Sequence, residues 1–291
     1  MQEPDREKYH TLIQLAKQED LGSGDITSEV TIPAEREGEA DIVFREAGVL
    51  CGMAVVKEVL REYDQRLRLT VYHTDGQSLK KGAIAGQIHG PLRGLLAAER
   101  VVLNFLQRLS GIATVTASYV EATAGTRAMI CDTRKTTPGW RELEKYAVRC
   151  GGGVNHRQGL YDAVLIKDNH LAALGQSSLV EGLKKAMKNI QRLAAPPRFI
   201  EVEVDTLEQL QQVLQVPGVD MILLDNMTPE LLAQAVQMRN QVNPDRTILL
   251  EASGGVVLDM VRRIARTGVD RISVGALTHQ IRSLDIGLDM V

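Results

Sequence analysis

The chain has 291 residues, which is enough for one large domain or two domains of ordinary size. Hydrophobic residues make up 44% of it, so it can bury a sizeable core, and 34 Lys and Arg against 37 Asp and Glu give a net charge of -3. This near balance of charge, with an aromatic content of only 3%, argues against a general binder of nucleic acids or membrane surfaces.

The cysteines and the N-terminal residues bear on the compartment. Cys51, Cys131 and Cys150 form no Cys-x-x-Cys pair, so the sequence indicates neither a disulfide framework nor a zinc site. The N-terminal residues lack the basic-then-apolar order of a signal peptide, and no uninterrupted apolar stretch approaches about 18 residues. We expect a soluble cytoplasmic protein with no nucleic-acid or membrane partner.

The first hundred or so residues alternate short strands with glycine-containing turns. Segments 41–49 and 67–73 alternate polar and apolar residues, and turns such as Asp75-Gly76 and Lys81-Gly82 separate such segments. Apolar residues recur at helical spacing from Leu96 to about Ala124, which predicts a long amphipathic helix. This region is expected to form an antiparallel sheet with helices.

Beyond residue 127 strands and helices alternate. Apolar runs predict strands at 128–131, 163–166, 199–204, 221–224, 248–250 and 272–274. Helix-start signals stand between them at Thr137-Pro138, Ser178 with Glu181, Thr206 with Gln209, and Thr228-Pro229. Because parallel neighbours need a crossover helix, this order predicts a parallel sheet. Six strands are fewer than a closed barrel has, so we predict an irregular or open α/β barrel.

Charged clusters follow the predicted parallel strands. The clusters are Asp132-Thr133-Arg134-Lys135, His156-Arg157, Lys167-Asp168-Asn169, Glu203 and Asp225-Asn226. Ligand sites of α/β barrels and open sheets form where the carboxyl ends of the strands meet, so these clusters can converge. Cations beside carboxylates predict a site for a polyanion next to a divalent metal.

Two loops carry cations with a possible binding role. Arg134 and Lys135 repel each other unless anionic oxygens bridge them, although they could also form an exposed turn. The glycine run 151–153 before His156 and Arg157 allows the close backbone approach that an anion cradle needs. It could equally be a flexible connector, and the histidine could be a satisfied hydrogen-bonding residue.

Three charged residues at strand ends admit more than one role. Lys167 could meet an anion, form a Schiff base, or pair with Asp168 or another acid. Glu203 and Asp225 could bind Mg²⁺, act as an acid–base pair, cap helices, or pair with Arg157 or Lys167. The sequence alone leaves these alternatives open.

Two glycine-containing turns predict a phosphate site. Ser253-Gly254-Gly255 lies between a predicted strand and a helix, and a helix N-terminus favours phosphate through its N–H groups. Gly275 is placed similarly after the next strand. Two consecutive turns of this kind are typical of the phosphate site of parallel barrels.

In this order, the motifs resemble those of the quinolinate phosphoribosyltransferases. The resemblance runs nearly end to end and also covers the segments 19–27, Glu99-Arg100, 109–114 and Glu201-Val202-Glu203-Val204. It implies an N-terminal α/β sandwich over 1–110, an incomplete α/β barrel over 111–277, and a tail, 278–291, that packs back on the sandwich.

The resemblance also implies an activity and a set of residues. Phosphoribosyl passes from 5-phosphoribosyl-1-pyrophosphate to quinolinate with loss of CO₂, giving nicotinate mononucleotide and pyrophosphate in NAD biosynthesis. Thr133, Arg134, Lys135, His156, Arg157 and Lys167 are expected around the quinolinate carboxylates and nearby phosphates, Glu203 and Asp225 at the ribose and its Mg²⁺-pyrophosphate, and Ser253, Gly254, Gly255 and Gly275 at the 5′-phosphate. Lys135, Lys167, Glu203 and Asp225 are the expected catalytic residues. The resemblance implies Mg²⁺, no organic cofactor, and a homo-oligomer, at least a dimer, in which Arg100 enters the partner's site.

Other functions are kept as alternatives. A nicotinate-type phosphoribosyltransferase would use a monocarboxylate and release no CO₂. A barrel aldolase would form a Schiff base on Lys167. A ligand-binding or scaffold protein without activity is the third alternative, but it gives no reason for a carboxylate pair beside so many cations.

Overall fold

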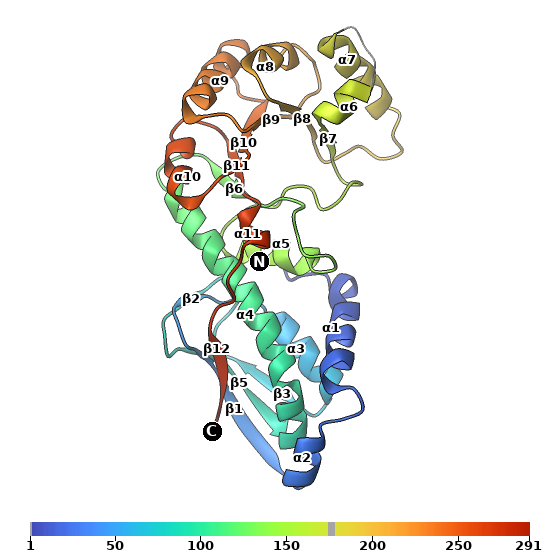
Figure 1. Cartoon of the computed structure of the whole chain (residues 1–291), viewed down its shortest axis with the longest axis vertical. Coiled ribbons are helices and arrows are strands. Elements are labelled where there is room, and N and C mark those ends of the chain that lie inside the picture. The colour runs from blue at the N-terminus through green and yellow to red at the C-terminus, as the bar shows by residue number, and fades with distance from the viewer. Residues whose placement is uncertain (1, 174–177) are drawn as a thin grey trace. The chain divides into compact units, whose positions relative to one another are not determined.

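The computed structural model describes residues 2–173 and 178–291. Met1 and residues 174–177, which the predicted domains 1–110 and 111–277 include, lie outside the described residues. Contacts divide the chain into two compact units, and Figure 1 follows its course through them. The first unit comprises 1–118, 135–153 and 277–291, and the second comprises 119–134 and 154–276.

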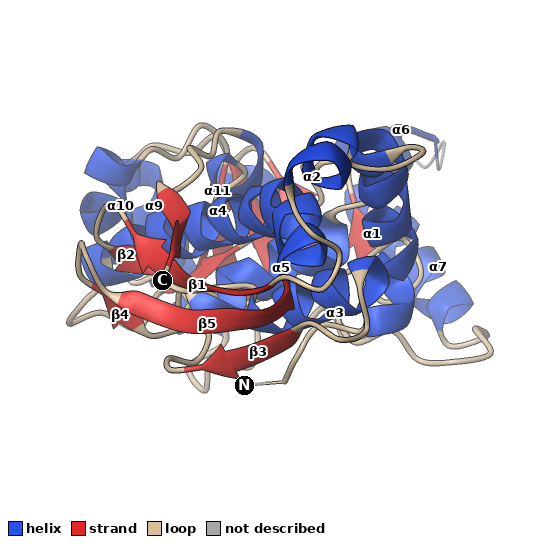
Figure 2. Ribbon diagram, turned by 90° about the horizontal axis from the view of Figure 1, so that it is seen from below, coloured by secondary structure: helices blue, strands red, loops and turns tan. Residues whose placement is uncertain are grey.

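An antiparallel sheet forms the centre of the first unit. Its strand order is β12-β1-β5-β3, with β1 at Glu37–Phe44, β3 at Arg68–Val71, β5 at Ile84–Pro91 and β12 at Ile286–Met290. A separate pair joins β2 (Gly48–Val49) to β4 (Ser78–Leu79). Figure 2 shows β1, β5 and β3 lying side by side with helix α3 (Met53–Tyr63) beside them. Ala40, Ile42 and Ile88 are buried while Glu39 and His89 are exposed, so burial alternates over these parts of β1 and β5, but the end of β1 is buried on both faces.

Helices complete the first unit. They are α1 (Arg6–Leu21), α2 (Ile26–Thr31), α3, the long α4 (Leu92–Ala122), which runs on into the second unit, α5 (Arg141–Cys150) and α11 (Ala276–His279), which begins at the end of that unit. Asp75 caps α3 from a distance, because its carboxylate accepts hydrogen bonds from the backbone N–H groups of Gly52 at 2.9 Å and Met53 at 3.1 Å. Among the described residues, no helix combines the length and apolar character needed to span a membrane.

A parallel sheet of six strands forms the second unit, in the order β6-β11-β10-β9-β8-β7. The strands are β6 (Met129–Cys131), β7 (Val164–Ile166), β8 (Ile200–Val204), β9 (Met221–Asp225), β10 (Leu249–Ser253) and β11 (Arg271–Ser273). Within the described part of the chain, β6 and β7 are the two ends of this sheet. The antiparallel N-terminal sheet and the open parallel sheet predicted from sequence are both confirmed.

The crossover helices of the second unit begin mostly where the sequence predicts. They are α6 (Asp168–Ala173), α7 (Leu179–Ile190), α8 (Leu207–Val213), α9 (Pro229–Val242) and α10 (Leu258–Ala265). The side chains of Ser178, Thr206 and Thr228 each accept a hydrogen bond from a backbone N–H of the first turn, and Thr206 forms a complete capping box with Gln209. These cap predictions are confirmed.

The helix start predicted at Thr137-Pro138 is wrong, since α5 begins at Arg141. The carboxylate of Glu144 and the guanidinium of Arg108 hold Thr137 in a turn, through its N–H and its hydroxyl respectively. Gly139 follows with φ +81°, which interrupts a right-handed helix. The predicted strand 41–49 is also divided, because β1 ends at Phe44 and β2 begins at Gly48.

Side chains alternate between two faces of the parallel sheet. Residues paired in register point to the same face, and we call one of them the apolar face: Ile166, Val202, Val204, Ile222, Leu224, Leu250, Ala252 and Ile272, all buried. The opposite, charged face carries Glu201 and Glu203 of β8, Asp225 of β9, Glu251 and Ser253 of β10, and Arg271 and Ser273 of β11. The charged side chains of these strands therefore share one side of the sheet.

The glycine run 151–153 ends helix α5 rather than forming a flexible connector. Gly152 has φ +87°, its N–H donates to the carbonyl of Arg149, and the N–H of Gly153 donates to the carbonyl of Val148, which is a Schellman motif. A Cβ on Gly151 would lie 2.4 Å from the backbone oxygen of Ala113. The run thus stops α5 and lets it approach α4 closely.

We expect Gly151→Ala to lower the free energy of unfolding by ~1–3 kcal/mol, because the added methyl group overlaps backbone that cannot move independently. Urea unfolding followed by circular dichroism measures the change. Gly152→Asn is the matched control, since asparagine tolerates a positive φ at this helix end and should lower stability by less than ~1 kcal/mol. Equal effects of the two substitutions would contradict this account of packing.

Candidate active site

An ion pair joins the ends of β7 and β8. Lys167 follows β7 directly, and its ammonium group contacts the carboxylate of Glu203 on β8. The lysine side chain is 42% exposed and the glutamate side chain 11% exposed, so the pair lies at the rim of the sheet. The sequence left several roles open for these two residues. The structure favours an ion pair between Lys167 and Glu203 over one between Lys167 and Asp168.

The next two strand ends are tied together through Asn226. Asp225 of β9 and Ser253 of β10 are register partners, and the N–H of Asn226 donates to the carbonyl of Ser253 at 2.9 Å. The Asn226 amide also donates to Asp225 Oδ2 at 2.7 Å. A Cβ on Gly254 would lie 2.1 Å from Asn226 Oδ1, so only glycine fits this turn. The carboxylate of Asp225 is therefore held in a fixed direction beside the turn.

The turn between β10 and α10 offers backbone N–H groups to a ligand. Gly254 and Gly255 have φ of +94° and +58°, and a Cβ on Gly255 would meet open space. Helix α10 begins after Val257, whose side chain makes no capping hydrogen bond. A glycine turn that leads into a helix N-terminus without a side-chain cap suits a phosphate. Gly275 follows β11 in the same unit, directly before α11.

The guanidinium groups of Arg134 and Arg157, both in the second unit, are near enough for their charges to interact. Burial, and then the positive charge of nearby Arg134, lower the pKa of Arg157. Arg157 is 7% exposed, and Arg134 and the neighbouring Thr133 are half-buried in the segment after β6. Two buried or half-buried cations that repel each other favour the binding of an anion between or beside them.

Asp132 holds the backbone of this region in place. It is fully buried, and its carboxylate accepts hydrogen bonds from the N–H of His156 at 2.9 Å and from the side-chain amide of Asn155 at 2.5 Å. Val154 forms an isolated parallel bridge with Cys131 at the end of β6. Residues 154–156 thus run along the end of β6 and lead directly to Arg157.

His156 points into the core instead of toward solvent, and it is 6% exposed. Its Nε2 lies 2.8 Å from Glu201 Oε2 and 3.4 Å from Glu251 Oε1. Burial opposes the charged ring, but hydrogen bonds and negative charge from the two glutamates outweigh it and raise the pKa of His156 to about 9. The structure therefore places the predicted site histidine in a buried charge network.

Glu201 and Glu251 were not among the residues predicted from sequence. Both are fully buried, each two residues before a predicted site residue on the same strand. Two-residue spacing on a strand puts Glu201 beneath Glu203, and Glu251 beneath Ser253, on the charged face. That spacing, in Glu-Val-Glu and Glu-Ala-Ser, is the signal that could have identified them.

Two predicted residues belong to the first unit. Lys135 is exposed, and its carbonyl accepts a hydrogen bond from the Thr278 hydroxyl at 2.6 Å. Arg100 is exposed on α4. The structure brings together Lys167 with Glu203, Asp225 with Ser253 and Gly254, and Arg134 with Arg157, all within the second unit.

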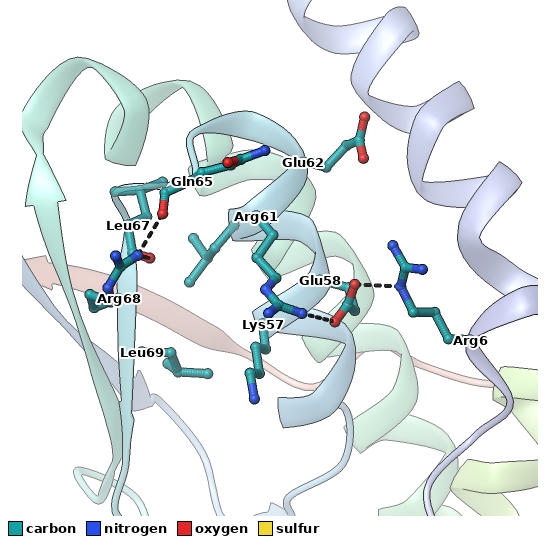
Figure 3. A pocket seen from close by; sticks show the side chains of 10 residues that line it. Arg6, Lys57, Glu58, Arg61, Glu62, Gln65, Leu67, Arg68 and Leu69 are labelled. Carbon is teal, nitrogen blue, oxygen red and sulfur yellow. Dashed lines mark hydrogen bonds and ion pairs between the residues drawn. The ribbon is translucent and has the colours of Figure 1, made fainter.

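A separate cavity of about 640 Å³ lies on the first unit and contains none of the predicted site residues. Figure 3 shows its lining side chains, which come from α1, α3 and the chain around β3. Glu58 pairs there with Arg6 at 2.6 Å and with Arg61 at 3.1 Å. These exposed pairs neutralise one another in part, so the cavity is not the candidate active site.

Carboxylates that suit a metal stand at the strand ends. Glu203, the residue before the last of β8, and Asp225, the last residue of β9, are half-buried near the ends of neighbouring strands. This suits Mg²⁺, because the ion takes one or two carboxylates and keeps water and substrate oxygens. The deeper group of His156, Glu201 and Glu251 is also close enough to ligate an ion. It is already balanced by Arg271, whose Nε lies 3.1 Å from Glu251 Oε2.

Family models match almost the whole chain. The model for the quinolinate phosphoribosyl transferase N-terminal domain matches residues 25–110, and the C-terminal domain model matches 112–289. The two models meet inside α4.

Named relatives and solved structures agree with these models. A nicotinate-nucleotide pyrophosphorylase [carboxylating] of Mycobacterium leprae is 48% identical over 96% of this chain and 95% of its own length. A probable enzyme of the same name from Bacillus subtilis is 45% identical over 94% of this chain and 90% of its own length. The solved nicotinate-nucleotide pyrophosphorylase of Francisella tularensis superposes with a TM-score of 0.89 at 36% identity, covering 99% of this chain and 98% of its own. The chain belongs to the quinolinate phosphoribosyltransferase family.

Proposed function

We propose that the second unit of this chain binds quinolinate and 5-phosphoribosyl-1-pyrophosphate and forms nicotinate mononucleotide, pyrophosphate and CO₂. The observation that supports this most directly is the arrangement of charge on one face of the parallel sheet. Buried or half-buried cations lie near β6, carboxylates end β8 and β9, and a glycine turn follows β10. A dianion, a ribose and a phosphate each have a complementary group there.

The cations orient the acceptor and offset repulsion between the two substrates. Quinolinate carries two carboxylates and the donor carries several phosphate charges, so they repel each other strongly in a site with little water. Arg134 and Arg157 can each donate two parallel hydrogen bonds to a carboxylate. Held in this way, the pyridine nitrogen can be directed at the anomeric carbon of the ribose.

The carboxylates act where positive charge develops. The bond from the anomeric carbon to the pyrophosphate oxygen breaks, and its electrons leave with pyrophosphate, so the ribose becomes cationic. Glu203 and Asp225, fixed by Lys167 and Asn226, can stabilise that charge electrostatically. The ring nitrogen then forms the new bond and becomes positive, which lets the adjacent carboxylate leave as CO₂ while its bonding electrons move to the ring carbon and a proton replaces it.

The donor is expected to bind together with Mg²⁺, which supplies positive charge to the pyrophosphate when bound. Glu203 and Asp225 are the residues that would hold the ion, directly or through water or substrate oxygens. Gly254, Gly255 and Gly275 would bind the 5′-phosphate through backbone N–H groups, with Ser253 donating its hydroxyl. The chain needs no organic cofactor in this scheme, because the alkylated pyridine is its own electron sink.

Assembly and location form part of the same proposal. Arg100 and Lys135, which belong to the first unit, are proposed to serve a site in a homodimer or larger assembly, with Arg100 entering the partner's site. We propose the cytoplasm as the compartment, consistent with three buried free cysteines.

The ion pair of Lys167 bears on the aldolase alternative. A Schiff base forms on a neutral amine, whereas Lys167 contacts the Glu203 carboxylate as a salt bridge. An ammonium group held in this way serves to bind anions. The arrangement therefore supports phosphoribosyl transfer over Schiff-base chemistry.

The reaction itself gives the first test. With quinolinate, 5-phosphoribosyl-1-pyrophosphate and Mg²⁺, we expect CO₂ and pyrophosphate to be released in equal amounts, measured with carboxyl-labelled quinolinate and a pyrophosphate assay. Nicotinate in place of quinolinate should release no CO₂. Faster pyrophosphate release with nicotinate than with quinolinate would show a nicotinate-type enzyme instead.

Replacing a positively charged residue of the proposed site should lower the catalytic activity and leave the fold intact. We expect Arg134→Ala and Lys167→Ala each to lower kcat/KM by at least ~100-fold, since each leaves an anionic partner unpaired. Arg263→Ala is the control, because Arg263 is 70% exposed and pairs only at the surface of α10 with Glu230. Full activity in either site variant, with an unchanged circular dichroism spectrum, would reject the site assignment.

Sharing of the site between subunits can be tested by mixing inactive variants. In an equal mixture of Arg100→Ala and Lys167→Ala subunits, a hybrid dimer contains one site with both residues intact, so about a quarter of wild-type activity should return. Subunit exchange is verified with two affinity tags. If the purified hybrid stays inactive, Arg100 does not act across the interface.

A further inference from the structure

Both ring nitrogens of His156 are engaged by the protein. Nε2 lies 2.8 Å from Glu201 Oε2, and Nδ1 accepts a hydrogen bond from the backbone N–H of Arg157 at 2.8 Å. The ring also packs edge-on against Phe199, with centroids 5.3 Å apart. With 6% exposure, the histidine has no ring nitrogen directed at a ligand in this arrangement.

Glu251 is the anchor of this arrangement. Its Oε1 lies 3.4 Å from His156 Nε2 and accepts a hydrogen bond from the Ser273 hydroxyl, while its Oε2 pairs with Arg271 Nε at 3.1 Å. Arg271 in turn contacts Cys131 Sγ at 2.6 Å on β6. A continuous set of contacts therefore runs from β6 and β11 through β10 to the histidine.

The contacts of His156 fix the position of the Arg157 backbone. The N–H of His156 donates to Asp132 at 2.9 Å, and the N–H of Arg157 donates to the imidazole, so both N–H groups at this point are bound to side chains. Arg157 lies close enough to Arg134 for their charges to interact. A guanidinium held near a second cation needs such support, because mutual repulsion alone would drive the two apart.

We propose that His156 and Glu251 are positioning residues: they do not touch quinolinate, but fix the backbone of Arg157 so that its guanidinium meets a quinolinate carboxylate. This inference rests on the proposed function and refines it. It assigns to His156 a different task from the substrate contact that the family resemblance implies. It also gives Glu251, Arg271 and Ser273 a task in the reaction.

The position of the ring proton follows from the same contacts. A neutral imidazole with its proton on Nε2 satisfies Glu201, Glu251 and the Arg157 amide together. The carboxylates favour a second proton, and they raise the pKa of His156, but a proton on Nδ1 would face the N–H of Arg157 at 2.8 Å. Arg271 and Arg157 oppose the second proton as well, since both are positive and near the same carboxylates. The form with bare Nδ1 is therefore the one that supports Arg157.

Steady-state kinetics test the positioning role. We expect Glu251→Gln to raise the KM for quinolinate about tenfold, while the KM for 5-phosphoribosyl-1-pyrophosphate changes less than about twofold. Ser273→Ala, which keeps every charge and removes one hydroxyl, should act in the same direction by about threefold. Glu230→Gln is the matched control, because this glutamate side chain is 67% exposed. Equal changes in the KM values of both substrates would overturn the proposal.

A double variant separates positioning from a general loss of stability. If Glu251 acts through the histidine, His156→Gln with Glu251→Gln should have the same quinolinate KM as His156→Gln alone. Fold-changes that multiply would show that Glu251 acts by another route, and would overturn the proposal. If Glu251→Gln does not fold, the same comparison of single and double variants is made with Ser273→Ala and His156→Gln.

The nitrogen chemical shifts of ¹⁵N-labelled histidine provide a readout that does not depend on turnover. At about pH 10, above the raised pKa of His156, we expect the ring to show one protonated nitrogen, Nε2, and one bare nitrogen, Nδ1, with His156→Gln identifying the signals. A proton on Nδ1 instead of Nε2 in the singly protonated ring would overturn the proposal. Wild-type protein that failed to convert quinolinate would refute the proposed function, whereas these shifts would still decide the arrangement of His156.

Discussion

The two-residue period of a β-strand determines how the second unit is built. Because successive side chains point to opposite faces, a strand can bury aliphatic residues on one face and carry charge on the other. β8 shows this most clearly, with Val202 and Val204 on the apolar face and Glu201 and Glu203 on the charged face. Register with its neighbours extends the division across the sheet, so residues far apart in sequence share one side.

Charge on a buried face must be balanced locally. An isolated buried ion is strongly unfavourable, and a buried ion pair is acceptable only when its remaining polar atoms have partners. Glu251 meets this condition in part: it pairs with Arg271 and accepts a hydrogen bond from Ser273, but its Oε2 and Arg271 Nε, although close, form no hydrogen bond among the described residues. The buried carboxylates Glu201 and Glu251 are therefore compensated mostly by groups of the same layer, whereas Glu203 and Asp225 lie nearer the strand ends and are half-buried.

Local signals predicted much of the fold and part of the site. The caps at Ser178, Thr206 and Thr228 depend on contacts within one turn, so the sequence contains all the necessary information. The helix start predicted at Thr137 was wrong because Arg108, which lies on α4, and Glu144, in the first turn of α5, hold Thr137 in a turn. The partner of Lys167 could not be chosen from sequence for the same reason, since Glu203 becomes its neighbour only through the pairing of β7 and β8. Glu201 and Glu251 were overlooked because the strands that contain them were considered as apolar runs with charge only at their ends.

The pairing of β12 with β1 has a consequence for synthesis of the chain. β1 occupies residues 37–44, yet one of its two neighbours in the sheet is formed by residues 286–290. Every strand of the parallel sheet lies between them in chain order, so a ribosome must produce the whole second unit before this sheet can be complete. Until then one edge of β1 exposes unpaired backbone groups, which other chains can also bind. Completion of the first unit's sheet during translation therefore has to wait until residues 286–290 have been synthesised.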